Sequence, residues 1–320
     1  MSPSPVSLPM SSFSSLLLRR ISMITTAFPF IILTFLQICC VASLGTSATS
    51  NTHSDTKIMS SSKQINNVVV AIAMEAEAKP FIEHLNLIQE DSFFSSKTPF
   101  LAYRGEHHSC QITVITNGKD TVHGMGVDNV GTVPAALATF LALEKLNSDK
   151  DNDSKNSNNV CDLVINAGTC GGFQRKGAEI GDVFFTTAVA NHDRRIPLGP
   201  FEPYGVGKIE SMDVSHLAEV IGAKLGVCTT GNSLDAHDID DHHMKVNDAS
   251  VKDMEAAAIA WSCQLHGTPY VGLKVVTDIV DGDKPTQEEF MENLGTAAKS
   301  LQEALPKVIE QVCGSKRDEL

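Results

Sequence analysis

Several apolar runs, each about the length of one strand, alternate with helical patterns from residue 68 onward. A continuous apolar run bounded by polar residues is typical of a strand that is buried on both faces. Strands that alternate with helices, without an internal repeat, favour a parallel sheet covered by helices. The sequence therefore predicts one α/β domain with a mixed, mainly parallel central sheet flanked by helices. The predicted strands are residues 68–73, 111–116, 162–166, 183–185 and 271–276. The predicted helices are residues 78–85, 130–146 and 285–312, together with a helix in the small-residue run at 253–260 that starts near Glu255.

The charge and the cysteine pattern narrow the classes of function. The chain carries 25 Lys and Arg residues against 38 Asp and Glu residues, a net charge of −13, and no basic stripe. This balance argues against nucleic-acid binding. The eight cysteines are scattered without a CxxC pair, which predicts buried free thiols rather than a disulfide framework or a zinc site.

The first 65 residues are expected to form an extension and linker outside the folded domain. Arg19 and Arg20 precede an apolar stretch at residues 23–44, and small residues follow it. This order is typical of a secretory signal peptide. A single membrane anchor is the alternative, because the stretch approaches spanning length. Contact with a membrane is expected only if the segment stays uncleaved.

The other end of the chain bears on the cellular compartment. Residues 317–320 read Arg-Asp-Glu-Leu, which differs from the standard retention signals of the endoplasmic reticulum in its first residue. If residues 1–48 act as a signal, this tail predicts the lumen of the endoplasmic reticulum, where the sequon at Asn152 would be glycosylated. Translation from Met59 would give a cytoplasmic protein instead. The expected limits are 1–65 for the extension, 66–313 for the domain and 314–320 for the tail.

Three acidic residues stand where predicted strands end or helices begin. Glu77 follows the first strand, Glu255 opens the small-residue run at 253–260, and Asp278 directly follows the last strand. Ligands of α/β folds bind at the carboxyl ends of the strands, so these acids indicate a catalytic pocket. A charge that complements a helix dipole is the plainer interpretation of Glu77 and Glu255.

A glycine-rich segment, residues 168–172 (GTCGG), comes after the third predicted strand. It lacks the spacing of a dinucleotide-binding or phosphate-binding loop. Two interpretations are about equally supported. The segment forms a tight turn, or its backbone N–H groups line a pocket at the edge of the sheet.

Four motifs in a fixed order give the chain a resemblance to a known family. They are residues 70–77 (VAIAMEAE), 165–172 (INAGTCGG), 253–258 (DMEAAA) and 276–278 (VTD). Together they resemble the nucleoside phosphorylase/nucleosidase superfamily, and most of all the plant 5′-methylthioadenosine/S-adenosylhomocysteine nucleosidases. The resemblance covers residues 66–312 and implies the fold of that superfamily.

The resemblance implies a role for each matching side chain. Glu77 resembles the carboxylate that deprotonates the attacking water, and Asp278 resembles the acid that protonates N7 of adenine. Glu255 resembles the carboxylate that binds the ribose hydroxyls. The further substrate-binding positions are Met254 against the sugar, Thr169 beside it, Leu234 in a strand edge at residues 233–235 that reads the base, Thr277 in the last motif, and Phe290 over the alkylthio group.

These residue types suit the cleavage of an N-glycosidic bond. The transition state resembles an oxocarbenium ion, and adenine leaves well once N7 is protonated by a general acid. One carboxyl group must then stay protonated while another stays ionised. No metal or cofactor is required. The implied reaction is hydrolysis of 5′-methylthioadenosine, with S-adenosylhomocysteine as a second candidate substrate, by a homodimer in methionine salvage, releasing adenine and a 5-alkylthioribose.

Two other functions are weighed against this one. A vegetative or bark storage protein of the same superfamily would have lost the catalytic carboxylates, which this chain keeps. A nucleoside phosphorylase needs a cationic phosphate site, whereas residues 168–172 contain no arginine and Glu77 would repel phosphate. One departure from the family is Asn232, which stands where an aspartate is usual.

Overall fold

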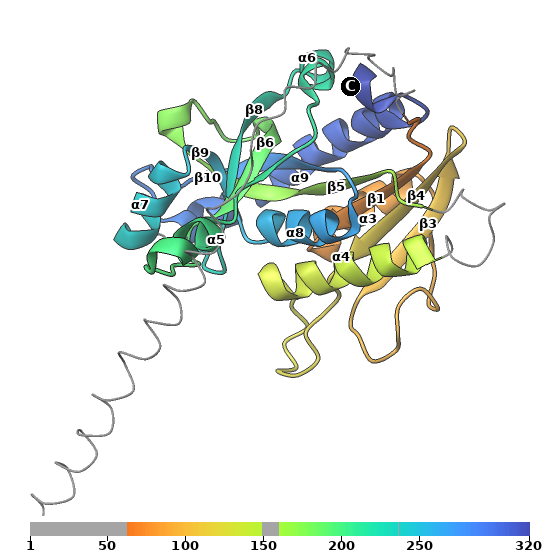
Figure 1. Ribbon diagram of the computed structural model, residues 1–320, viewed down its shortest axis with the longest axis horizontal. Coiled ribbons are helices and arrows are strands. Elements are labelled where there is room, and N and C mark those ends of the chain that lie inside the picture. The colour runs from red at the N-terminus through yellow and green to blue at the C-terminus, as the bar shows by residue number, and fades with distance from the viewer. Residues whose placement is uncertain (1–62, 149–159, 236) are drawn as a thin grey trace, which may run out of the picture. The chain divides into compact units, whose positions relative to one another are not determined.

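A ten-stranded sheet runs through the part of the chain that the computed structural model describes, residues 63–148, 160–235 and 237–320 (Figure 1). The strands are ordered β10-β6-β8-β9-β5-β1-β4-β3-β2, and β7 pairs with β6. Their bounds are Asn67–Ile72 (β1), Ile88–Gln89 (β2), Leu101–His107 (β3), Cys110–Thr116 (β4), Leu163–Gly172 (β5), Val183–Asn191 (β6), Ile209–Glu210 (β7), Lys224–Thr230 (β8), Ala249–Asp253 (β9) and Tyr270–Ile279 (β10).

Half of this sheet closes on itself. Strand β10 pairs with β6 and also with β5, so β5, β9, β8, β6 and β10 form a closed ring. The long ladders between β1 and β4, β5 and β10, and β6 and β8 are parallel. The pairings of β2 with β3 and of β3 with β4 are antiparallel. The prediction of a mixed, mainly parallel sheet is confirmed.

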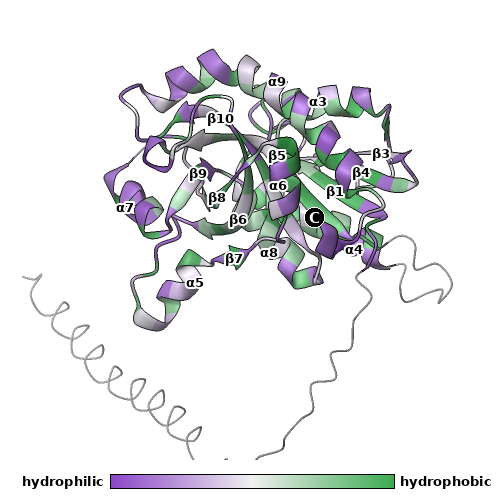
Figure 2. Cartoon of the chain, turned by 90° about the horizontal axis from the view of Figure 1, so that it is seen from above, coloured by the Kyte–Doolittle hydropathy of each residue, from purple (hydrophilic) through white to green (hydrophobic). Residues whose placement is uncertain are grey.

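Helices cover both faces of the sheet. Figure 2 shows α3 and α9 on one side and α4 and α8 on the other. Alternate residues of β1 belong to two different hydrophobic clusters, Val68 and Val70 to one and Val69 and Ala71 to the other. This two-sided burial is why the strand reads as a continuous apolar run. The helices are Glu75–His84 (α3), Thr132–Asn147 (α4), Glu202–Val206 (α5), Ser215–Ile221 (α6), Asp238–Val246 (α7), Ala256–His266 (α8) and Thr286–Val312 (α9).

The glycine-rich segment forms the last half of β5 and is neither a turn nor a loop. It pairs with β10 on one side and, at Gly171 and Gly172, with β9 on the other. A Cβ atom at Gly171 would lie 2.5 Å from the Val280 side chain and 2.8 Å from Asp278 Oδ2. Glycine is therefore required here so that neighbouring side chains can lie directly against the strand.

Strands β2, β3, β7, β8 and β9 and helices α5, α6 and α7 are not among the elements that the sequence predicts. Strand β8 includes Lys224 and Gly226 and has exposed positions at its start, so it lacks a continuous apolar run. Strand β9 is fully buried but contains Lys252 and Asp253 among its five residues. A search for apolar runs misses such a buried strand, because its charged residues interrupt the run.

Residues 314–320 pack against the domain. The backbone N–H of Ile65 donates to the Ser315 carbonyl oxygen, and Arg317 Nη2 lies 2.8 Å from the carbonyl oxygen of Asp162. Leu320 is buried within the cluster that contains β1 and α9. The signal-like segment and the sequon at Asn152 lie outside the described residues. Among the residues described, no helix is long and apolar enough to cross a membrane.

Candidate active site

A cavity of about 240 Å³ opens where β1, β5 and β10 end. These three strands are parallel neighbours, so their carboxyl ends meet at one edge of the sheet. The loop after β8 and the first turns of α9 complete the wall. All eight residues predicted for the site line this cavity: Glu77, Thr169, Leu234, Met254, Glu255, Thr277, Asp278 and Phe290.

Glu77 lies in the first turn of α3, directly beyond β1. Its Oε1 accepts two hydrogen bonds from Thr169, one from the backbone N–H at 2.8 Å and one from the hydroxyl at 2.6 Å. Its Oε2 lies over Gly168, where a Cβ atom would sit only 3.3 Å away. Burial raises the pKa of Glu77, while the hydrogen bonds from Thr169 and the charge of Lys274 oppose the rise.

Asp278 stands near the end of β10, opposite Gly171 of β5. Its Oδ1 lies 2.7 Å from the Thr277 hydroxyl, whereas its buried Oδ2 has no hydrogen-bond partner among the described residues. Burial raises the pKa of Asp278, and the Glu289 charge acts in the same direction. A buried carboxyl oxygen without a partner and a raised pKa favour a protonated acid that can donate to a ligand.

Glu255 precedes the first residue of α8 and occupies the N-cap position. Its Oε1 accepts a hydrogen bond of 2.8 Å from the backbone N–H of Gly131, which precedes α4. Burial and the nearby Asp253 charge raise the pKa of Glu255 to about 7, although Lys274 opposes this rise. The expected helix-start position of Glu255 is confirmed.

A buried ion pair beneath these carboxyl groups was not anticipated. Lys274 Nζ lies 2.8 Å from Asp253 Oδ2, and both side chains are almost completely buried. Asp253 also accepts hydrogen bonds from the Ala256 N–H and the Thr230 hydroxyl. Burial works against both charges, yet Lys274 holds the pKa of Asp253 below its usual value, and Asp253 raises that of Lys274. A lysine within the apolar run 271–276 was the signal that could have revealed this pair.

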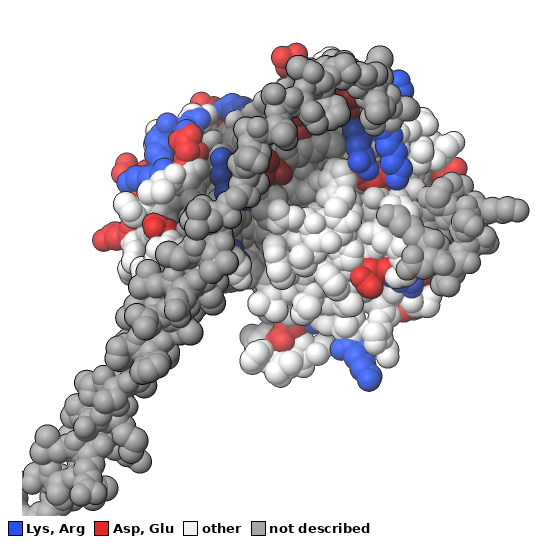
Figure 3. Space-filling view, in the orientation of Figure 1, with Lys and Arg blue, Asp and Glu red and all other residues white. Residues whose placement is uncertain are grey.

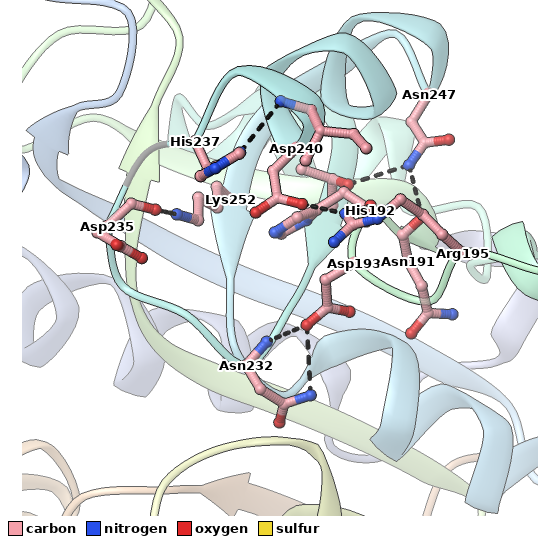
Figure 4. A network of polar contacts seen from close by, with 12 residues as sticks. Asn191, His192, Asp193, Arg195, Asn232, Asp235, His237, Asp240, Asn247 and Lys252 are labelled. Carbon is pink, nitrogen blue, oxygen red and sulfur yellow. Dashed lines mark hydrogen bonds and ion pairs between the residues drawn. The ribbon is translucent and has the colours of Figure 1, made fainter. Parts of the chain in front are cut away.

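The cavity wall at residues 233–235 differs from the strand edge expected there. Ser233 and Leu234 line the cavity from a loop between β8 and α7, because the strand ends at Thr230. Asn232 fixes the start of this loop: its N–H donates to Asp193 Oδ2 at 2.6 Å (Figure 4). The side-chain oxygen of Asn232 accepts from the N–H and the hydroxyl of Thr132.

Two clusters whose residue types could bind a ligand, residues 192–195 and 241–243, do not line this cavity. His192 is buried, at 2% exposed, and Arg195 forms an ion pair with Asp240. His242 and His243 belong to helix α7. Within residues 63–148, 160–235 and 237–320, no group of His, Cys, Asp and Glu residues is arranged to hold a metal ion.

Comparisons with known proteins identify relatives over most of the chain. The family model described as the phosphorylase superfamily matches residues 67–310. A 5′-methylthioadenosine nucleosidase of Arabidopsis thaliana is 42% identical over 259 residues, which cover 81% of this chain and 91% of the relative. A 5′-methylthioadenosine/S-adenosylhomocysteine nucleosidase of the same plant is 39% identical over 253 residues, covering 79% and 94%. The apo structure of the Arabidopsis thaliana 5′-methylthioadenosine nucleosidase matches with a TM-score of 0.74 at 42% identity, covering 81% of this chain and 100% of that one.

We predict that Lys274→Met destabilises the fold by about 3–5 kcal/mol, because the substitution leaves Asp253 buried without its counter-charge. The control is Lys299→Met, which removes an exposed lysine 3.9 Å from Glu303 and should change stability by less than about 0.5 kcal/mol. Denaturant-induced unfolding of both variants measures the two values. Equal effects of the two substitutions would contradict the structural importance of the buried pair.

We also predict that the stability advantage of wild type over Glu255→Gln falls as pH rises. The pKa of Glu255 is about 7 in the folded state and 4.5 as a model value. The stabilisation is therefore complete below about pH 4.5 and is lost as pH rises through about 7. Thermal unfolding of both proteins between these pH values measures the difference, with Glu83→Gln as the exposed control. A difference that grows with pH would show that the Glu255 carboxylate is stabilised on folding.

Proposed function

The chain belongs to the phosphorylase superfamily, and we propose that it hydrolyses the N-glycosidic bond of 5′-methylthioadenosine through Glu77, Asp278 and Glu255. The products are adenine and 5-methylthioribose, and S-adenosylhomocysteine is a second candidate substrate. The observation that carries the proposal is the convergence of these three carboxyl groups, from three separate segments of the chain, on one cavity. The nucleosidases of Arabidopsis thaliana named above support the same reaction.

Glu77 acts on the attacking water in this scheme. Thr169 holds Oε1 with two hydrogen bonds, so the carboxylate is fixed while Oε2 faces the cavity floor at Gly168. The same hydrogen bonds favour the ionised form against the effect of burial. An ionised, oriented carboxylate can take a proton from water as the C1′–N9 bond breaks.

Asp278 acts on the leaving group. Its Oδ2 is buried, has no hydrogen-bond partner among the described residues, and can donate a proton to N7 of adenine. The transfer leaves a neutral base, so the electrons of the breaking bond do not accumulate on an adenine anion. The environments of Asp278 and Glu77 differ in their hydrogen bonds, which allows one carboxyl group to be protonated while the other is ionised.

Glu255 binds the sugar. An ionised carboxylate accepts several hydrogen bonds and can hold two vicinal hydroxyl groups. The Gly131 N–H occupies Oε1 and fixes the direction of the side chain. Met254 lies beside it in the cavity wall, where a thioether side chain can pack against the ribose. Burial favours the protonated form of Glu255, whereas hydrogen bonds from the hydroxyl groups of the sugar would favour the ionised form.

Water is the favoured nucleophile over phosphate. Among the described residues that line the cavity, the cations are Lys252 and Lys274. Lys274 is paired with Asp253, and Lys252 donates to two backbone carbonyl oxygens. Neither is a free cation for a phosphate ion, and Glu77 would repel one. The place of this reaction in methionine salvage, which recovers the methylthioribose, is part of the proposal.

A homodimer is also part of the proposal, supported by an exposed apolar face on α4 and α8. Val133, Leu137 and Leu141 follow one another at helical spacing on α4, and Trp261 and Leu265 do so on α8, all exposed. Figure 3 shows few charges over these helices. Contiguous exposed apolar surface of this kind marks a protein–protein interface. Glu255 is held by Gly131 at the start of α4, so a partner on this face would lie close to the sugar site.

We predict that Asp278→Asn and Glu77→Gln each lower kcat for adenine release from 5′-methylthioadenosine by roughly 10²–10⁴-fold, the usual contribution of a general acid or base. Glu288→Gln, on the exposed first turn of α9, serves as the matched control and should keep wild-type activity. The assay uses purified protein that spans residues 60–320, and the released adenine is quantified by chromatography. Wild-type protein without adenine release, or Asp278→Asn with wild-type rates, would rule out the proposed function.

We predict that wild-type protein sediments as a dimer and that the double variant Leu137→Glu/Trp261→Glu sediments as a monomer. Two buried, unpaired carboxylates would oppose association of the apolar faces. Val220→Glu places the same charge at an exposed apolar position on α6 and should leave the dimer intact. Analytical ultracentrifugation at micromolar concentration distinguishes the states. A monomeric wild type would contradict the proposed interface.

A further inference from the structure

Lys252 is a buried lysine whose charge is directed at backbone carbonyl oxygens. It lies in β9 and is 5% exposed. Its Nζ donates to the Leu234 carbonyl oxygen at 3.0 Å and to the Asp235 carbonyl oxygen at 2.7 Å, as Figure 4 shows for Asp235. In the described parts of the chain, Lys252 forms no ion pair with a carboxylate. Its ammonium group therefore depends on the loop for much of its hydrogen bonding.

The loop that Lys252 holds is the base-side wall of the cavity. Ser233 and Leu234 line the cavity together with Lys252 itself. Asn232 fixes the start of the loop through Asp193, and Lys252 fixes its next turn. Residues 231–235 and 237, the described part of this loop, form no helix or strand, so their geometry depends on these side-chain contacts.

A purely structural role would not require a charge at this position. Burial of an ammonium group costs several kcal/mol unless hydrogen bonds and nearby charges compensate, and a neutral side chain would fill a strand position without that cost. What the charge adds is a pair of strong hydrogen bonds to two successive carbonyl groups. These bonds restrict the loop in the place where an adenine would be recognised by backbone contacts.

We propose that Lys252 is a positioning residue that fixes residues 233–235 for recognition of the adenine base. The inference rests on the proposed function for the identity of the ligand, but its structural part concerns the loop alone. Loss of Lys252 should weaken binding of the base more than it slows the chemical step, because a loosened wall affects substrate and transition state alike.

Lys252 also faces the proposed acid from across the cavity wall. The groups around Asp278 are Lys252 on β9, Glu289 on α9, the Cys170 thiol on β5 and Thr277 on its own strand. Burial and Glu289 raise the pKa of Asp278, whereas the Thr277 hydrogen bond and the Lys252 charge lower it. Removal of Lys252 should therefore move the alkaline limb of the kcat/KM profile to higher pH.

The test compares Lys252→Met with wild type and with Lys224→Met. Lys224 serves as a control because its Nζ also donates to a loop carbonyl oxygen, that of Gly177 at 2.7 Å, and lies outside the cavity; unlike Lys252, it is partly exposed and pairs with Asp182 at 2.6 Å. Hydrogen exchange is followed in the peptide that covers residues 231–237, and KM and kcat are measured with 5′-methylthioadenosine. If Lys252→Met does not fold, Lys252→Gln, which keeps a donor but not the charge, is measured by the same criteria.

The expected result for Lys252→Met is faster exchange in the loop and a KM raised about tenfold, because a loosened loop binds the base less tightly, with a smaller change in kcat. Lys224→Met should show neither effect. Unchanged loop exchange in Lys252→Met, or a loss confined to kcat, would overturn the inference. A wild-type protein that releases no adenine would instead overturn the proposed function, and the exchange measurement would still decide the role of Lys252 in holding the loop.

Discussion

The ion pair between Lys274 and Asp253 is the interaction on which the arrangement of the site depends. It joins β10 to β9 in the wall of the cavity, and Asp253 also accepts a hydrogen bond from the Ala256 N–H at the start of α8. Glu255 therefore has its position set by the same carboxylate that holds Lys274. One ammonium group also acts electrostatically on Glu77 and Glu255. The charge of Lys274 thus stabilises acidic groups from several segments of the chain. With a neutral residue in its place, the ionised forms of these groups would repel one another in surroundings of low polarity.

The backbone adds a second constraint, which is space. The carboxyl groups of Glu77 and Asp278 both lie against β5, one over Gly168 and the other against Gly171. A side chain at either glycine would occupy the volume that these carboxyl groups need. The parallel pairing of β5 with β1 and β10 then brings the ends of three strands to the same edge. Strand pairing, the glycines and the buried lysine together bring acidic residues that are far apart in the sequence into one site.

The sequence predicted the class of fold because β1, β4, β5, β6 and β10 are buried on both faces and read as apolar runs. The eight site positions came from ordered motifs and the family they resemble, and all eight line one cavity; their individual roles stay predictions. Asp253, Lys252 and Lys274 were given no role, because the meaning of a charge inside a strand depends on a partner that sequence spacing does not supply. Leu234 was placed at a strand edge, but β8 ends at Thr230 and the residue lies in a loop.

Hydrolysis requires that the site direct water, and not phosphate, to C1′ of the nucleoside. A single turnover in phosphate-free buffer prepared with ¹⁸O-labelled water distinguishes the two nucleophiles, with the released methylthioribose trapped at once by reduction and analysed by mass spectrometry. If water attacks, adenine is released without phosphate and the sugar carries one ¹⁸O atom at C1′. A requirement for phosphate, with methylthioribose 1-phosphate as the product, would show that phosphate is the nucleophile instead.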